Sequence, residues 1–309
     1  MKRTRRYWLR LIILAVVGVA AGVFLPPLLI GVAMLWGLTH PACNPGGTPA
    51  QFGMNYEDIS FPSTRGVTQE GYFIPGTNGA TVIIPPAFGN GRGGDLHYAA
   101  VFNGAGFNVI TFDGRVCTSY GHTSMGYVEV EDVEAAYAYL QTRPDVDATR
   151  VTLHGFSSAG ATSLMAAARM PAIRGVSAEG NYVDIPHALG MDQPQTFLYS
   201  LTYWSASLTY RLVTGEDISV LSPIKAMATI GARPVLLIYG TLDGAYADAP
   251  SLRDAAEAGG AAVELWIVEG ARHGEYMAVA GAEFDQRVIT FHCEALGGRL
   301  ELTPIPRCL

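Results

Sequence analysis

Charged side chains are scarce in this sequence, and one long stretch has none. Only 15% of the 309 residues are charged, whereas 49% are hydrophobic. The 28 residues from Leu11 to Leu38 contain no charge, and a helix needs only about 20 apolar residues to cross a bilayer. The sequence therefore predicts a membrane-spanning helix within residues 11–38.

Acidic residues are missing from the first ten positions, which contain five basic ones. By the positive-inside rule this basic tip stays in the cytoplasm, and the chain after Leu38 lies on the extracytoplasmic side of the cell membrane. Pro26-Pro27 interrupts the apolar stretch, and each half is too short to cross alone, which favours a single kinked span. A cleaved signal peptide remains the alternative, because Leu11–Leu25 would serve as its apolar region.

Basic residues are also in short supply after the tip. Without the first five, 15 basic residues stand against 27 acidic ones, a formal charge of −12, which excludes a surface suited to nucleic acid. The glycine-rich segments lack a Gly-Lys-Ser/Thr ending, so no nucleotide site is expected. No Cys-x-x-Cys or His-x-x-x-His spacing indicates a metal.

The sequence has only four cysteines: Cys43, Cys117, Cys293 and Cys308. Their even number and the expected oxidising compartment favour disulfides, with Cys293 paired to Cys308 and Cys43 to Cys117. Free buried thiols are the alternative. Lipid attachment at Cys43 is disfavoured, because a branched apolar residue is expected three positions before a lipidated cysteine and His40 stands there.

The segment after the predicted span is rich in proline and glycine and is typical of a linker. We therefore expect a tip and anchor in residues 1–40, a linker in 41–54 and one domain in 55–309. Eight apolar runs in the domain predict strands: Tyr56–Phe61, Gln69–Ile74, Ala80–Ile84, Phe107–Phe112, Arg150–His154, Gly175–Ala178, Pro234–Tyr239 and Ala262–Val268. Five segments predict helices: Leu96–Asn103, Val128–Arg143, Ser158–Arg169, Ser251–Ala258 and Glu283–Leu296.

Alternation of short apolar strands with helices predicts an α/β fold, with a mostly parallel eight-stranded sheet covered on both faces. Residues 181–222 break the alternation and are rich in aromatics, which predicts a lid over the edge of the sheet. Its aromatic side chains could line an apolar substrate pocket or form the lid's own core.

The hexapeptide Gly155–Gly160, Gly-Phe-Ser-Ser-Ala-Gly, directly follows a predicted strand and has the form of a nucleophile elbow. Small residues must stand two before and two after the serine, where Gly155 and Ala159 flank Ser157. Ser158 is the weaker choice because Phe156 would then stand two before it. Turning and capping alone would also explain Gly and Ser here.

Two further residues follow later strands of the predicted sheet. Asp243 comes after the strand at 234–239, and His273 comes after the strand at 262–268. Ligands bind at the carboxyl ends of parallel strands, and the order Ser, Asp, His is that of a triad on such a sheet. His273 would take the Ser157 proton, and Asp243 would orient His273.

Other assignments compete with these. Glu179 at the end of the strand at 175–178 is the alternative acid, and His122 is a rival base only if the fold is different. His154, inside a strand, is expected to be structural. The oxyanion would be bound by the backbone N–H of Ser158 and of Phe88, with Ala87 as the next choice, because the neighbouring prolines have no N–H.

With these motifs in place, residues 56–296 resemble the α/β-hydrolase superfamily. Residues 145–151 and 233–240 look like its dienelactone hydrolase and prolyl oligopeptidase-like branch, especially membrane-anchored serine hydrolases. The resemblance implies a triad of Ser157, Asp243 and His273 acting on small-molecule or lipid-like acyl substrates without a metal or organic cofactor. Pro86-Ala87 replaces the usual His-Gly in the oxyanion loop.

We therefore expect a single-pass membrane serine hydrolase that cleaves carboxylic esters. An amidase or peptidase with the same triad is the alternative enzyme. A catalytically silent scaffold that binds a lipid or a partner is the alternative from another class.

Overall fold

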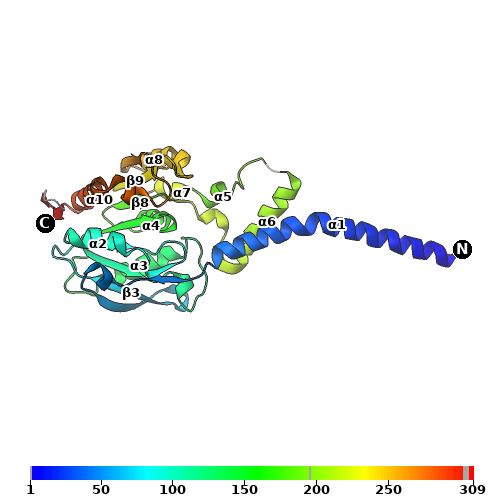
Figure 1. The fold of residues 1–309 in the computed structure, drawn as a ribbon, viewed down its shortest axis with the longest axis horizontal. Coiled ribbons are helices and arrows are strands. Elements are labelled where there is room, and N and C mark those ends of the chain that lie inside the picture. Colours follow the sequence, from blue (N-terminus) through cyan, green and yellow to red (C-terminus); the bar gives the residue numbers. More distant parts are fainter. Residues whose placement is uncertain (1, 195, 302–305) are drawn as a thin grey trace.

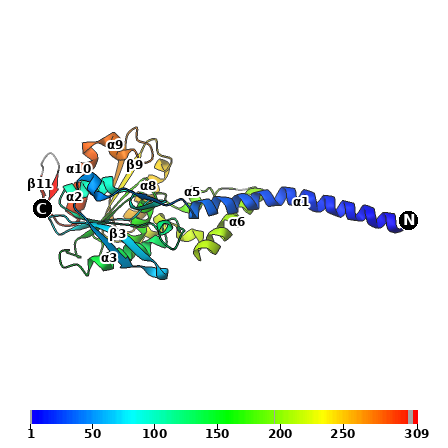
Figure 2. The same ribbon diagram turned by 60° about the horizontal axis from the view of Figure 1, so that its bottom comes forward.

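A computed structural model describes residues 2–194, 196–301 and 306–309 (Figure 1). One helix, α1 (Lys2–Thr39), projects from a domain built on a central sheet (Figures 1 and 2). It runs without a break in helical structure through Pro26 and Pro27. In the described part of the chain it alone is long and apolar enough to cross a membrane, a criterion that a signal sequence also meets.

The central sheet has eight strands in the order β10-β9-β8-β7-β4-β6-β3-β2. Pairing is parallel from β10 to β6, while β3 is antiparallel to both β6 and β2. The bounds are β2 Glu57–Pro62, β3 Thr68–Ile74, β4 Thr81–Ile84, β6 Asn108–Phe112, β7 Val151–Phe156, β8 Val176–Glu179, β9 Pro234–Gly240 and β10 Ala262–Val268. The predicted fold class and all eight predicted strands are confirmed.

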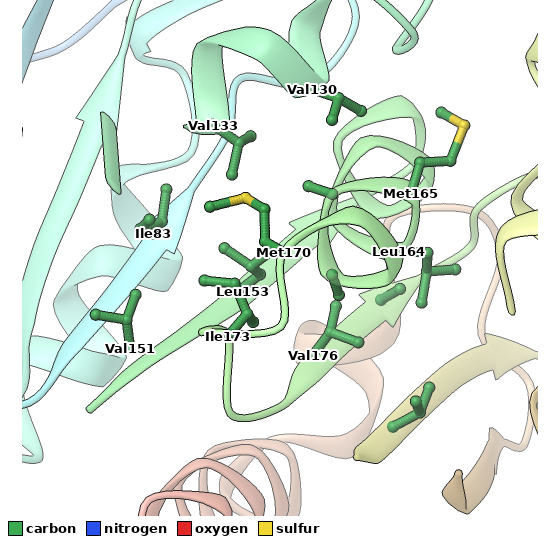
Figure 3. Packing of buried hydrophobic residues seen from close by; sticks show 14 of the residues in the cluster. Ile83, Val130, Val133, Val151, Leu153, Leu164, Met165, Met170, Ile173 and Val176 are labelled. Carbon is green, nitrogen blue, oxygen red and sulfur yellow. The ribbon is translucent and has the colours of Figure 1, made fainter. Parts of the chain in front are cut away.

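Helices cover both faces because the strand side chains alternate between two buried clusters. Ile83 of β4 joins one cluster with α3 and α4 (Figure 3), whereas Val82 and Ile84 join the other with α2 and α10. Each fully buried aliphatic side chain contributes about 1.5–3 kcal/mol. The helices are α2 Leu96–Gly104, α3 Glu129–Leu140, α4 Ser158–Arg169, α7 Pro223–Met227, α8 Ala249–Ala258, α9 Tyr276–Ala280 and α10 Ala282–Ala295.

The segment expected to be a linker is fastened to the domain. Its strand β1 (Asn44–Gly46) pairs in parallel with β5 (Asn90–Gly93). A disulfide joins Cys43 to Cys117, and a second joins Cys293 to Cys308. Both predicted pairings are therefore confirmed, and the alternative of free thiols is wrong.

The remaining elements are short and lie mostly in loops: η1 Pro49–Phe52, η2 Thr64–Gly66, η3 Arg115–Cys117, η4 Ile218–Val220, η5 Tyr246–Asp248, α5 Ile185–Ala188, β11 Leu300–Glu301 and β12 Arg307–Cys308. The 3₁₀ helices and α5 lie between the larger helices and strands, and β11 pairs with β12 near the C-terminus.

The segment predicted to be a lid, residues 181–222, leaves the domain and returns to it at one loop beside Ser158. There the Tyr182 hydroxyl donates to the Met125 carbonyl oxygen at 2.7 Å, and the Tyr210 hydroxyl donates to the Ser124 carbonyl oxygen at 3.0 Å. The main helix of the segment, α6 (Phe197–Thr214), lies beside α1 and projects from the domain, with its C-terminal end at the domain (Figures 1 and 2). Outside the domain, α1 is the apolar partner of α6.

Phe197, Tyr199 and Trp204 are about 60% exposed or more, whereas Tyr210 is fully buried in a cluster with Ile185, Ala206, Ile218 and Leu221 of the same segment. Of the two expected roles, a core of the lid is therefore present, and it contains Tyr210.

Candidate active site

Ser157 occupies a strained turn between β7 and α4. Its φ of 55° and ψ of −122° lie in a region that L-residues rarely adopt. Its amide donates to the Glu179 carbonyl oxygen at 2.7 Å, which holds the turn against β8. Strain of this kind is typical of a nucleophile elbow, because it lifts the hydroxyl clear of the backbone.

Small side chains flank this turn for a steric reason. A Cβ on Gly155 would lie 2.4 Å from the carbonyl carbon of Ala159, and a Cβ on Gly160 would lie 2.9 Å from the Gly155 oxygen. Strand and helix therefore approach as closely as the hexapeptide predicts.

The loops after β9 and β10 bring Asp243 and His273 to Ser157. His273 Nε2 lies 3.1 Å from Ser157 Oγ, and His273 Nδ1 lies 3.1 Å from Asp243 Oδ2. Asp243 is buried, while the His273 side chain is 47% exposed. With Nδ1–H donated to the carboxylate, Nε2 is free to accept the serine proton.

Tyr276 completes the surroundings of Asp243. Its hydroxyl donates to Asp243 Oδ2 and lies 3.5 Å from His273 Nδ1. Burial would raise the pKa of Asp243, but hydrogen bonds from His273, Tyr276 and the Ala245 amide outweigh it and hold the pKa below its usual range. Asp243 is therefore ionised at neutral pH.

The sequence analysis missed Tyr276, whose one signal is its place three residues after His273. It also missed Gly180, which follows β8 with a φ of +53°. A Cβ on Gly180 would lie 2.2 Å from the Tyr276 hydroxyl and 3.0 Å from both Asp243 Oδ2 and His273 Nδ1. Only glycine leaves room for these three groups to meet.

Ser158 and Phe88, the two expected oxyanion donors, line one recess of about 20 Å³. The Ser158 amide is at the first position of α4, where a helix offers no internal acceptor. Within the described residues, the Phe88 amide has no acceptor either. Ala87, the second choice, donates its amide to Asp95 Oδ2 at 3.2 Å and is committed elsewhere.

Glu179, the alternative acid, belongs to a different group of side chains. Its Oε2 accepts from the Tyr98 hydroxyl at 2.8 Å, and its Oε1 lies 3.3 Å from His154 Nε2. Burial raises the pKa of Glu179 to about 8, and burial lowers the pKa of His154. Both are therefore neutral at pH 7, and Glu179 can donate its proton to His154 Nε2.

Hydrogen bonds continue from this pair through the core. His154 Nδ1 lies 2.8 Å from Ser177 Oγ, which lies 2.7 Å from His292 Nε2, and His292 Nδ1 lies 2.8 Å from Thr152 Oγ1. Every histidine in this row is fully buried. The row explains why His154 is structural, as expected.

His122, the rival base, stacks on Tyr120 and its Nδ1 lies 3.0 Å from the Tyr120 carbonyl oxygen. It makes no hydrogen bond to Ser157 in the described structure. Within the described residues, no three His, Cys, Asp or Glu side chains are grouped to hold a metal ion.

Solved structures with similar folds include hydrolases. The esterase Pf2001 of Pyrococcus furiosus aligns over 84% of this chain and 98% of its own, with 22% identity and a TM-score of 0.67. A puromycin-hydrolyzing peptidase of Mycobacterium tuberculosis aligns over 80% of this chain and 40% of its own, with 20% identity and a TM-score of 0.64. At these identities the likeness shows the α/β-hydrolase fold.

Among curated proteins, the α/β hydrolase domain-containing protein WAV2 of Arabidopsis thaliana is 28% identical over 74% of both chains. The polyketide transferase af380 of Aspergillus fumigatus is 30% identical over 37% of this chain and 41% of its own. The match thus spans less than half the length of that transferase.

The model of the prolyl oligopeptidase family matches residues 95–299, about two thirds of the chain. That range begins before α2 and includes the elbow and the loops after β9 and β10. The chain is therefore a serine hydrolase of the α/β-hydrolase fold, and it belongs to the prolyl oligopeptidase family.

Proposed function

We propose that this protein cleaves carboxylic esters through a triad of Ser157, His273 and Asp243. The observation that carries the proposal is the row Ser157 Oγ, His273 Nε2, His273 Nδ1 and Asp243 Oδ2, with 3.1 Å at both contacts. A serine hydroxyl becomes nucleophilic when an imidazole can take its proton. The ionised Asp243 holds the tautomer that leaves Nε2 free.

In the proposed reaction, Ser157 Oγ attacks the acyl carbon while its proton moves to His273 Nε2. The tetrahedral oxyanion accepts hydrogen bonds from the Ser158 and Phe88 amides. The C–O bond of the leaving group then breaks, and His273 returns the proton to the departing alkoxide. Water, deprotonated by His273, attacks the acyl-enzyme and releases the acid and Ser157.

A peptidase or amidase reaction is the second candidate. Membership of the prolyl oligopeptidase family favours it, because the same residues can protonate an amine leaving group. The two candidates differ in the leaving group and not in the nucleophile, so paired substrates separate them.

We also propose that α1 anchors the domain on the extracytoplasmic side of the cell membrane. The helix carries basic residues only at its N-terminal end, and its residues 11–38 carry no charge. Two disulfides agree with an oxidising compartment. A membrane-impermeant reagent should therefore reach the domain in intact cells, and protection of the domain would contradict this orientation.

A fluorophosphonate probe tests the chemistry, because it reacts only with an activated serine. We expect labelling of the full chain that disappears in Ser157→Ala and persists in the neighbouring Ser158→Ala. No Ser157-dependent labelling would leave a silent scaffold that binds a lipid or a partner. Esters of graded chain length should then be compared with matched amides, and faster turnover of the amides would favour the peptidase.

A further inference from the structure

Helix α6 has an apolar face that the domain does not cover. Residues 197–210 contain no charge, and the first charged residue of the helix is Arg211. Six large apolar side chains of α6 are 41–77% exposed: Phe197, Leu198, Tyr199, Trp204, Leu208 and Leu212. An apolar surface of this kind on one helix marks an interaction site.

The opposite side of α6 packs along the outer half of α1. Ser205 Oγ on this side donates to the Leu28 carbonyl oxygen at 2.9 Å. At the N-terminal end of α6 the largely exposed Phe197 ring also touches the Phe24 ring edge to face, with the ring centroids 6.1 Å apart. Further along, Leu35 packs with Ala206 and Tyr210 in one buried cluster. The two helices therefore run in the same direction, in register from Phe24 to Leu35.

Small and hydroxyl-bearing residues make this contact close. A Cβ on Gly31 would lie 2.1 Å from the Thr202 carbonyl oxygen, so α6 approaches α1 where α1 has no side chain. Close approach at glycine and hydrogen bonds from serine to backbone are how helices associate in lipid.

The register sets the depth of α6 relative to α1. At 1.5 Å per residue, about 30 Å of helix from Leu11 ends near Ile30. Phe197, beside Phe24, then lies roughly 9 Å inside the outer boundary of the hydrocarbon. Ser205, beside Leu28, lies near that boundary, and the charged Arg211 lies outside it.

We propose that the N-terminal half of α6, residues 197–205, is a second membrane-embedded element, with its exposed side chains against the lipid of the outer leaflet. The inference rests on the proposed anchoring by α1, because whatever surrounds the outer half of α1 also surrounds α6. Tyr199 and Trp204 would lie at the depth where membrane proteins concentrate aromatic side chains. Lipid is the occupant that the charge-free face and its continuity with α1 favour.

The two helices meet the domain close to the recess beside Ser157. The Tyr210 hydroxyl donates to the Ser124 carbonyl oxygen at 3.0 Å. Two residues on, Gly126 lines the recess together with Ser158. The candidate site therefore stands next to the surface that α6 would embed, and esters carried in the bilayer are the substrates that this placement favours.

Nitroxide labels on the full chain in liposomes test the placement. All four native cysteines are in disulfides, so one introduced cysteine is the only thiol. Tyr199→Cys probes α6, Leu14→Cys is the matched control in α1, and Glu257→Cys is the matched control on α8. We expect the label at Tyr199 to collide more often with dissolved oxygen than with a water-soluble nickel chelate, as at Leu14.

A Tyr199 label that favours the nickel chelate, as Glu257 should, would overturn the proposal. Shielding from both reagents would also overturn it and would indicate a second copy of the chain on α6. If the Leu14 label favours the chelate, the anchoring by α1 fails, and the proposal for α6 fails with it. Hydrolysis of a soluble short-chain ester, measured on the same samples, reports separately on the proposed reaction.

Activity gives a second, independent readout. Replacing Tyr199 and Trp204 by aspartate should lower hydrolysis of a long-chain ester held in phosphatidylcholine vesicles by about tenfold or more, because charge in the hydrocarbon is costly. Turnover of a soluble short-chain ester should stay within twofold. Equal turnover of the vesicle ester by variant and parent would contradict the proposal.

Discussion

Asp243 and Glu179 are two buried carboxyl groups at the ends of neighbouring strands: Asp243 follows β9, and Glu179 is the last residue of β8. The pKa of Asp243 is held below its usual range, whereas the pKa of Glu179 is raised to about 8. Asp243 accepts hydrogen bonds from His273, Tyr276 and an amide, and Glu179 accepts one from Tyr98. Burial raises the pKa of both groups, but at Asp243, which is the less deeply buried, the additional donors outweigh it and keep the carboxylate ionised for the catalytic histidine.

The largest expected effect comes from removing the ionised carboxylate of Asp243, compared with removing the neutral carboxyl group of Glu179. Asp243→Asn should lower kcat by about 10⁴-fold, because the amide favours the wrong tautomer of His273. Glu179→Gln is the matched control and should lower kcat by less than about tenfold, because Glu179 is already neutral. Steady-state kinetics on a soluble ester measure both, and similar losses in the two variants would remove the distinction.

Crowding around Asp243 gives the next largest effect. Gly180→Ala should lower kcat by about 10²-fold, since the new methyl group displaces Tyr276, Asp243 and His273. Gly281→Ala is the control for backbone strain, because Gly281 has a similar φ of +56° and nothing within 4 Å of the added carbon. A loss in Gly281→Ala as large as in Gly180→Ala would point to the backbone instead.

Removing one donor from Asp243 should have a smaller effect. Tyr276→Phe should lower kcat by about tenfold, the weight of one hydrogen bond to a charged group. The pKa of Asp243 should rise, so activity in the variant should be lost at a higher pH as the solution is acidified. A pH profile of kcat that is lowered but not shifted would mean that Tyr276 only fills space.

Replacing Glu179 by glutamine should have the smallest effect on turnover. It should, however, change how the free energy of unfolding depends on pH. The folded pKa of Glu179 lies above the unfolded value, so the stability present below about pH 4.5 is lost as the pH rises to about 8. Glu179→Gln should therefore reduce that decline, by at most about 1.4 kcal/mol per pH unit. For Asp243 the sign is reversed, and its stabilisation is lost as the pH falls through its low folded pKa.

Denaturant unfolding of the full chain in detergent, measured across this pH range, checks the prediction. Ser177→Ala leaves both carboxyl groups in place and is the control for a change elsewhere in the buried row. An unchanged slope in Glu179→Gln would show that the carboxyl group does not titrate as described.

The eight strands of the central sheet and the helices α2, α3, α4, α8 and α10 were predictable, because each carries its own apolar pattern and they alternate regularly along the chain. The meeting of Ser157, Asp243 and His273 also followed, since all three come after parallel strands whose ends share one edge. Tyr276 and Gly180 were not predictable, because their importance depends on distances between loops. Helix α6 within the predicted lid segment, and its packing along α1, were not predicted, because aromatic composition does not say which surface a segment covers.

The disulfide between Cys43 and Cys117 limits how far the domain can move relative to α1. If residues 41–54 were a flexible linker, the domain could move by roughly 20 Å relative to α1. Instead, Cys43 lies four residues beyond the end of α1 and is joined to Cys117. The two residues before Cys117, Arg115 and Val116, line the recess beside Ser158. With α1 in the membrane as proposed, the disulfide holds the catalytic edge at a fixed distance and orientation from the membrane, so the substrate has to come to Ser157.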